Sequence, residues 1–240
     1  MSNMKKYENV ERLVIKVGTG FLFDKNGNEK GYIFRPDQMD ALTEEAYLLS
    51  KEMDVVIVSS GAIATSLWRQ KIYDIPSDPI IRAGLAGEGQ DYLISQYRER
   101  IEKYGGRTAQ ALITSEDIAK RDRRRHLRAV QEYWFRKGTI AVYNENDTVT
   151  SEEISKRIKH KISFGDNDIL SALFASIIDA DILVMLSYSI EGLGTGGRES
   201  KEAAQEILTK VGIPIEILND RYEIGDSGIY KPKIRELFPV

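Results

Sequence analysis

The sequence contains no cysteine. Disulfide bonds, thiolate metal sites and cysteine nucleophiles are therefore excluded. With only two histidines, His126 and His160, a histidine-rich metal site is not expected either. Nowhere do about 18 apolar residues run together, and the N-terminal stretch MSNMKKYENVERLVIKVG has no long apolar run of the signal-peptide kind. We therefore expect a soluble, cytoplasmic protein without a membrane partner.

The chain also lacks an excess of basic charge. Its formal net charge of -3 and its pI of about 5.6 give no overall positive field of the kind that attracts nucleic acid. The one dense basic run, RDRRRHLR at 121–128, is interpreted as the solvated face of a helix whose charges pair with nearby acids. We expect no nucleic-acid partner.

With 240 residues, 42% of them hydrophobic, the chain is long enough for one substantial core. Apolar runs predict strands at 11–18, 54–60, 107–114, 139–144, 181–187 and 213–218. Amphipathic runs predict helices at 36–53, 80–105, 115–138, 166–180 and 199–212. This alternation predicts an α/β fold, a three-layer α/β/α sandwich with an open, mainly parallel sheet and crossover helices.

Three further segments carry expectations of their own. Residues 21–34 are expected to form a hairpin that turns at Asn26-Gly27 or just after it. The helix at 80–105 is expected to be interrupted at its glycines, because glycine weakens a helix. The last stretch, 220–240, is short and tail-like.

One glycine-rich stretch, GLGTGG at 192–197, has the spacing of a dinucleotide-binding turn. In that fold the first glycine follows the first strand almost directly, whereas here SYSIE intervenes and the stretch lies in the last βα unit. A P-loop is excluded because Arg198 stands where that motif has lysine. The stretch by itself is compatible with either a plain connector or another kind of phosphate loop.

Glycines and polar residues cluster at the predicted ends of several strands. KVGTG at 16–20 follows the first strand, SSGAI at 59–63 the second and NENDT at 144–148 the fourth, while FGDND at 164–168 precedes a helix. Ligands gather at the carboxyl ends of strands in open α/β sheets, and glycines let backbone N–H groups approach an anion. A second lysine, Lys201, opens the last predicted helix. Two cations with an acid to orient them are the equipment of phosphoryl transfer.

The motifs VIKVGTG, VIVSSGAIA, YNENDTV, FGDNDILSA and GLGTGGRESKEAA resemble, in the same order, those of the amino acid kinase family. The resemblance covers about residues 10–212 and is to the members that phosphorylate the side-chain carboxylate of L-glutamate. It implies the fold typified by acetylglutamate kinase, and the use of ATP with Mg²⁺ to form L-glutamyl 5-phosphate, the first step of proline biosynthesis. It also implies a homo-oligomer, dimer or tetramer, and leaves open whether proline acts as an inhibitor.

The resemblance assigns roles residue by residue. Lys16 and Lys201 are implied as catalytic lysines on two sides of the phosphates, with Asp168 orienting both. Contacts to the amino-acid substrate are implied for Ser60, Asp147, Asn167 and Asn144. Contacts to nucleotide or phosphate are implied for Gly18, Thr19, Gly61, Ser187, Gly194, Thr195, Gly196 and Gly197. No residue is implied as a direct metal ligand.

The resemblance further implies a single domain over 1–240, with a substrate-binding part at about 1–165 and a nucleotide-binding part at about 166–240. The second part is shortened: Ser187-Tyr188 replaces the family's Thr-Asp, and only SIE then precedes Gly192, where the family has some tens of residues. Arg198 stands in place of a methionine, and an asparagine is replaced around Arg128. We expect a short form without the PUA domain that many bacterial members carry.

Three functions stay open at this point. The chain is interpreted first as a glutamate-phosphorylating enzyme with a trimmed nucleotide lobe. The alternatives are a kinase of another small carboxylate or acid, and a non-catalytic relative that binds ligand for regulation or assembly. Two opposed phosphate lysines argue against the last. Tight NADH binding would instead favour a dinucleotide oxidoreductase. Taken singly, Asp168 is also compatible with a helix cap and Asp147 with a turn cap.

Overall fold

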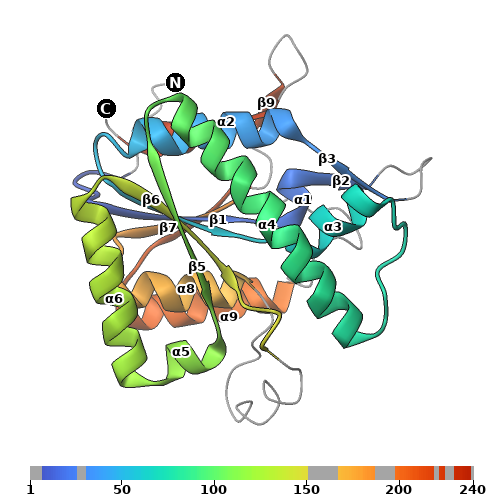
Figure 1. Cartoon of the computed structure of the whole chain (residues 1–240). Helices are drawn as coiled ribbons and strands as arrows, with labels where there is room; N and C mark the ends of the chain where they lie inside the picture. Colours follow the sequence, from blue (N-terminus) through green and yellow to red (C-terminus); the bar gives the residue numbers. More distant parts are fainter. Residues whose placement is uncertain are drawn as a thin grey trace.

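A six-stranded parallel sheet forms the centre of the molecule (Figure 1). The computed structural model describes residues 7–25, 31–150, 167–186, 198–218, 222–224 and 230–238. The strand order is β5-β6-β4-β1-β7-β8, and every pairing of neighbouring strands is parallel. The strands are β1 (Arg12–Val17), β4 (Asp54–Ser59), β5 (Arg107–Ile113), β6 (Thr139–Glu145), β7 (Ile182–Leu186) and β8 (Ile215–Leu218).

Helices cover both faces of this sheet, as Figure 1 shows. One face carries α1 (Thr19–Leu22), α2 (Pro36–Leu49), α3 (Ala62–Gln70) and α4 (Pro79–Lys103). The other face carries α5 (Ser115–Ala119), α6 (Arg121–Arg136), α8 (Asn167–Ile177) and α9 (Arg198–Val211). The predicted three-layer α/β/α sandwich is therefore confirmed. Among the described residues, no helix is both long and apolar enough to cross a membrane.

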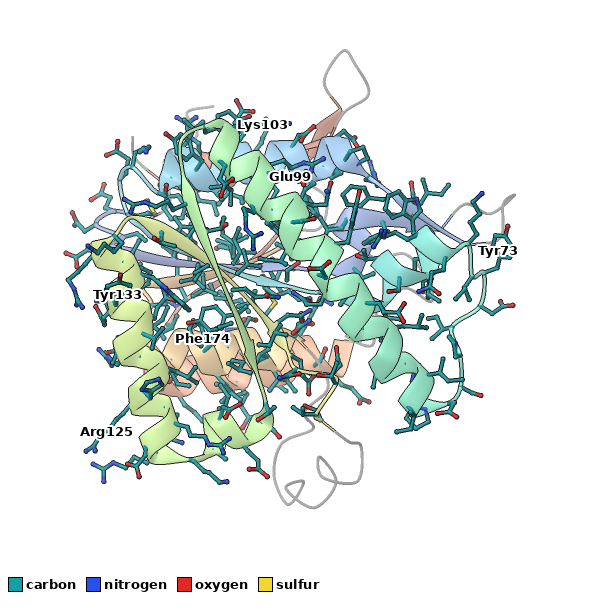
Figure 2. All side chains as sticks on the ribbon, viewed as in Figure 1. Tyr73, Glu99, Lys103, Arg125, Tyr133 and Phe174 are labelled. Atoms are coloured by element: carbon teal, nitrogen blue, oxygen red, sulfur yellow. The ribbon has the colours of Figure 1, made fainter. Side chains whose placement is uncertain are left out.

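Two clusters of buried apolar side chains fill the two interfaces between sheet and helices. Strand β1 contributes to both, since successive side chains of a strand point to opposite faces: Leu13 and Ile15 lie in one cluster and Val14 in the other. The same parity places Lys16 on the side of Val14, toward α8 and α9. Figure 2 shows Phe174 of α8 inside this second layer, where its ring centroid lies 4.0 Å from that of Tyr143.

The expected interruption of the helix at 80–105 is wrong, because α4 runs without a break from Pro79 to Lys103. One of its glycines, Gly89, allows the close crossing with α3 instead. A Cβ on Gly89 would lie 1.9 Å from the carbonyl oxygen of Ala62, and Ser66 of α3 donates a hydrogen bond of 2.7 Å to the carbonyl of Leu85. The close approach of two helices therefore explains glycine here better than helix propensity does.

The predicted helix at 115–138 is two helices, α5 and α6, with extended backbone at Lys120 between them. The basic run begins α6, and several of its arginines pair with acids, such as Arg123 with Asp117 and Arg128 with Asp179. His126 in the same run is exposed. The interpretation as a solvated, charge-paired helix face is confirmed.

A small antiparallel pair, β2 (Phe23–Lys25) and β3 (Tyr32–Phe34), confirms the predicted hairpin, whose turn lies outside the described residues. The expected tail is wrong. Strands β9 (Tyr222–Ile224) and β10 (Tyr230–Pro232) pair, and the short 3₁₀ helix η1 (Ile234–Leu237) packs on the core.

The end of η1 is held by apolar burial and by backbone hydrogen bonds. Ile234 and Phe238 are buried, and the N–H of Tyr7 donates to the carbonyl of Leu237 at 3.1 Å. The N–H of Arg235 donates to Glu45 Oε2 of α2 at 3.0 Å. The run IRELF is too short for its periodicity to predict this docking from sequence.

Candidate active site

Three charged residues meet at the carboxyl end of β1. Lys16, which is 5% exposed, forms an ion pair through Nζ with Oδ1 of Asp168, which is fully buried at the start of α8. Lys201 in the first turn of α9 places its Nζ 3.6 Å from Asp168 Oδ2. The hydroxyl of Ser200 donates to the same oxygen at 3.1 Å. One carboxylate thus bridges two lysines from different elements.

This arrangement has an electrostatic consequence. Burying Lys16 and Asp168 removes both charges from water, a cost that their mutual attraction offsets. Lys201 remains partly exposed, with 23% of its side chain accessible. Two ammonium groups face one carboxylate, so the three residues together carry a net positive charge. A multiply charged anion such as a nucleotide phosphate suits this end of the sheet.

A chain of polar side chains lies beside the charged residues. The Nδ2 of Asn167, the residue before Asp168, donates to Ser60 Oγ at 2.7 Å and to Asn144 Oδ1 at 3.0 Å. Asn144, near the end of β6, donates in turn from its own Nδ2 to Gln90 Oε1 of α4 at 2.8 Å. The structure therefore brings together three of the four predicted substrate contacts, which come from β6, α8 and the turn after β4.

The fourth predicted substrate contact, Asp147, lies in the turn that follows β6. Hydrogen bonds from Asn146 N–H to the carbonyl of Ile113 (2.9 Å) and from Val149 N–H to the carbonyl of Asn146 (3.1 Å) hold this turn. Burial raises the pKa of Asp147 to about 6, because desolvation penalises the charged carboxylate. A carboxyl in this state gains from a cationic partner such as an ammonium group.

The glycine turns tie the strand ends together. The N–H of Gly18 donates to the carbonyl of Leu186 at the end of β7 (3.0 Å), so this amide links β1 to β7, and Thr19 then begins α1. Gly61, the N-cap of α3, has φ of +106°, a left-handed conformation that favours glycine. A Cβ there would also meet the ring of Phe23 at 3.3 Å.

The other predicted nucleotide contacts lie outside the described residues. They are Ser187, Gly194, Thr195, Gly196 and Gly197. The glycine-rich loop therefore remains a prediction from the sequence.

Sequence reasoning missed two residues of the site. Ser200 touches Asp168, and Gln90 touches Asn144. A signal for Gln90 was present: it follows Ala86 by four residues and precedes Leu93 by three, so it falls on the buried stripe of α4 where a polar side chain needs a partner. Nothing in the sequence around Ser200 distinguishes it from any helix-start serine.

The chain belongs to the amino acid kinase family, whose family model matches residues 11–234. Its curated relatives include a glutamate 5-kinase of Clavibacter michiganensis subsp. michiganensis, 35% identical over 90% of this chain and 76% of the relative. One from Symbiobacterium thermophilum is 32% identical over 88% of each chain. One from Myxococcus xanthus is 34% identical over 86% of this chain and 51% of the relative, so this chain spans about half the length of that relative.

Solved structures with the same fold include two UMP kinases. The enzyme from Ureaplasma parvum superposes with a TM-score of 0.53 at 12% identity, covering 91% of this chain and 92% of the other. The enzyme from Bacillus anthracis gives 0.52 at 14% identity, covering 88% and 87%. At such low identity these similarities establish the fold alone.

Proposed function

We propose that this protein transfers the γ-phosphoryl group of MgATP to the side-chain carboxylate of L-glutamate, giving L-glutamyl 5-phosphate and ADP. The observation that carries the proposal is the bridge of Lys16 and Lys201 by Asp168, next to the hydrogen-bonded amides of Asn167 and Asn144. The names of the relatives agree with it. A phosphate-binding half and an amino-acid-binding half thus adjoin at one end of the sheet.

The proposed reaction requires no covalent bond between the protein and the substrates. An oxygen of the side-chain carboxylate attacks the γ-phosphorus, the bond to the bridging oxygen of ADP breaks, and ADP leaves with that electron pair. The acceptor is already ionised near neutral pH, so no general base is required. Lys16 and Lys201 neutralise charge on the transferred group, and Asp168 keeps both ammonium groups in place.

Magnesium enters this scheme as part of the nucleotide substrate. Within the described residues, no group of three or more histidine, aspartate or glutamate side chains is arranged to hold a metal by itself. Phosphate oxygens and water would then supply most of the ligands, which is how Mg²⁺ is commonly held in kinase sites.

The site draws on both parts of the single domain. Residues of about 1–165 provide Lys16, Ser60, Asn144 and Asp147 and form the acceptor side. Residues of about 166–240 provide Lys201 and form the nucleotide side. The α8 start, with Asn167 and Asp168, joins the two, since it contacts residues of both.

Assembly and regulation belong to the same proposal. The first turn of α4 exposes Ile80 and Ile81, at 77% and 52%, which favours a homo-oligomer, dimer or tetramer. Light scattering of the purified protein measures its mass. Inhibition by proline is tested by adding it to the kinase assay.

The experiment that tests the proposed function measures ADP release from MgATP with L-glutamate, L-aspartate, N-acetyl-L-glutamate or UMP as acceptor. The proposal predicts ADP release dependent on L-glutamate, and much slower release with the other three. Equal or faster release with another acceptor would replace L-glutamate as the substrate, and no release with any would remove the kinase activity.

A further inference from the structure

The hydrogen-bonded amides beside the active site have a fixed polarity. The backbone N–H of Glu145 donates to Oδ1 of Asn144 at 2.9 Å. A backbone N–H can only donate, so the side-chain oxygen of Asn144 must be the atom that faces it. The Nδ2 of Asn144 therefore faces α4, where it requires an acceptor, and Oε1 of Gln90 provides one at 2.8 Å.

The orientation of the Asn144 carboxamide also determines that of the Asn167 carboxamide. Its Nδ2 lies 3.0 Å from Oδ1 of Asn144 and 3.5 Å from the carbonyl oxygen of Ser59, two atoms that only accept. The carboxamide of Asn167 must therefore present its Oδ1 on the other side. That oxygen is buried, and within the described ranges no group donates to it. A buried acceptor in this state favours a ligand that brings a hydrogen-bond donor.

L-glutamate has one charged group that can donate a hydrogen bond to Oδ1 of Asn167. Near neutral pH both carboxylates of the amino acid only accept hydrogen bonds, whereas its α-ammonium only donates. The ammonium is thus the one charged group of the substrate that fits Oδ1 of Asn167. A substrate of the same length without the amine, such as glutarate, cannot make this contact.

The position of Gln90 is fixed, so its side chain can keep the carboxamide of Asn144 in one orientation. It is 6% exposed, on the face of α4 that packs against the rest of the chain. The preceding residue, Gly89, lies in the tight crossing with α3, where an added Cβ would come within 1.9 Å of the carbonyl of Ala62. The backbone that carries Gln90 is therefore held by helix packing rather than by a loop.

We propose that Gln90 is a positioning residue that fixes the carboxamide of Asn144 and, through it, aims Oδ1 of Asn167 at the α-ammonium of the acceptor. Its consequence is selectivity for an amine-bearing acid over the same acid without the amine. The identity of that acid rests on the proposed function; the polarity of the amides does not.

The test compares variants of α4 on two acceptors. Gln90→Leu removes the acceptor for Asn144, while Gln90→Glu keeps an accepting oxygen. Gln90→Met is a second apolar variant of similar length in case the leucine protein folds poorly. The control is Gln96→Leu, a buried amide of the same helix whose Oε1 accepts from Arg100 instead. Steady-state constants are measured for L-glutamate and for glutarate, with glutarate also measured as a competitive inhibitor.

We expect Gln90→Leu and Gln90→Met to lower kcat/KM for L-glutamate about tenfold, equivalent to about 1.4 kcal/mol, mainly through KM. The constants for glutarate should change little, so discrimination by the amine falls. Gln90→Glu should stay close to wild type, and Gln96→Leu should leave the ratio of the two acceptors unchanged.

Equal losses for both acceptors would overturn the proposal, as would an unaltered ratio in both apolar variants or a glutamate variant as impaired as they are. If the wild-type protein turns over neither acid, the proposed function fails by itself. Calorimetric binding of L-glutamate and glutarate to the same variants then tests Gln90, and an unchanged ratio of affinities would overturn its role.

Discussion

Asp147 offers a prediction in which stability and activity move in opposite directions. Burial raises the pKa of its carboxyl to about 6, from an ordinary value of 3.8. The protonated form is therefore favoured by folding. Its stabilising contribution is present below about pH 4 and is lost as the pH rises through about 6. At pH 7.5 the ionised carboxyl destabilises the protein without substrate.

The magnitude follows from the size of the shift. About two pKa units correspond to about 3 kcal/mol of unfolding free energy at pH 7.5. For a chain of this length, 1 kcal/mol shifts the melting temperature by about 2–4 °C. Asp147→Asn removes the charge at nearly constant shape, so the variant should melt about 6–12 °C above wild type at pH 7.5. The difference should shrink as the pH falls toward 4.

The same variant should bind L-glutamate worse. If Asp147 contacts the substrate as proposed, its ionised carboxylate accepts a charged hydrogen bond from the α-ammonium, and losing that bond should raise KM about 10- to 100-fold. In the wild-type protein KM should rise as the pH drops below about 6, because protonation removes the charge. Calorimetric melts and initial rates over pH 4.5–8 measure both effects.

The control for this experiment is Asp122→Asn, at a carboxylate with 95% of its side chain exposed. It should alter neither the melting temperature nor KM by much at any of these pH values. An Asp147→Asn variant no more stable than wild type at pH 7.5, or a stability gain that does not depend on pH, would contradict a destabilising buried charge at Asp147.

Three further predictions concern the lysine bridge and the helix crossing. Asp168→Asn leaves the buried ammonium of Lys16 without its carboxylate, so it should lower the free energy of unfolding by about 3–5 kcal/mol and abolish most of kcat. Denaturant titration measures the loss of stability, and initial rates measure the loss of kcat. Lys201→Ala, at a partly exposed side chain, should lower kcat about 100-fold or more while a thermal melt stays near wild type, and unchanged turnover would contradict its role. Gly89→Ala should destabilise the protein by about 1–3 kcal/mol and raise KM for L-glutamate, because the new Cβ pushes α4 away from Ala62. The control is Gly84→Ala, where nothing lies within 4 Å of the added Cβ, and it should change neither stability nor KM.

Much of this fold could be predicted from sequence, because its signals are local. The runs that became β1, β4 and β7 are mostly apolar, without polar residues at every second position, which is typical of strands buried on both faces. Alternating side chains also put Lys16 on the opposite face from Ile15. Contacts between distant elements could not be predicted from these runs. In the sequence Gly89 suggests a helix interruption, and only the position of α3 against it explains the glycine.

Some residues of the candidate site could also be predicted from the sequence, whereas others required the structure. Lys16, Asp168 and Lys201 stand in motifs that resemble those of the amino acid kinase family, so they could be selected without a structure. Their meeting at one carboxylate required the arrangement of β1, α8 and α9. Gln90 lies outside those motifs, and its role follows only from the hydrogen-bond directions between α4 and β6.

Identification of the phosphorylated product decides whether the protein phosphorylates the side-chain carboxylate of L-glutamate. The protein is incubated with MgATP, L-glutamate and hydroxylamine, which converts an acyl phosphate to a hydroxamate, in parallel with Lys201→Ala. We expect γ-glutamyl hydroxamate in proportion to ADP with the wild-type protein, and a rate reduced about 100-fold or more with the variant. ADP without hydroxamate, or equal hydroxamate from both proteins, would contradict it.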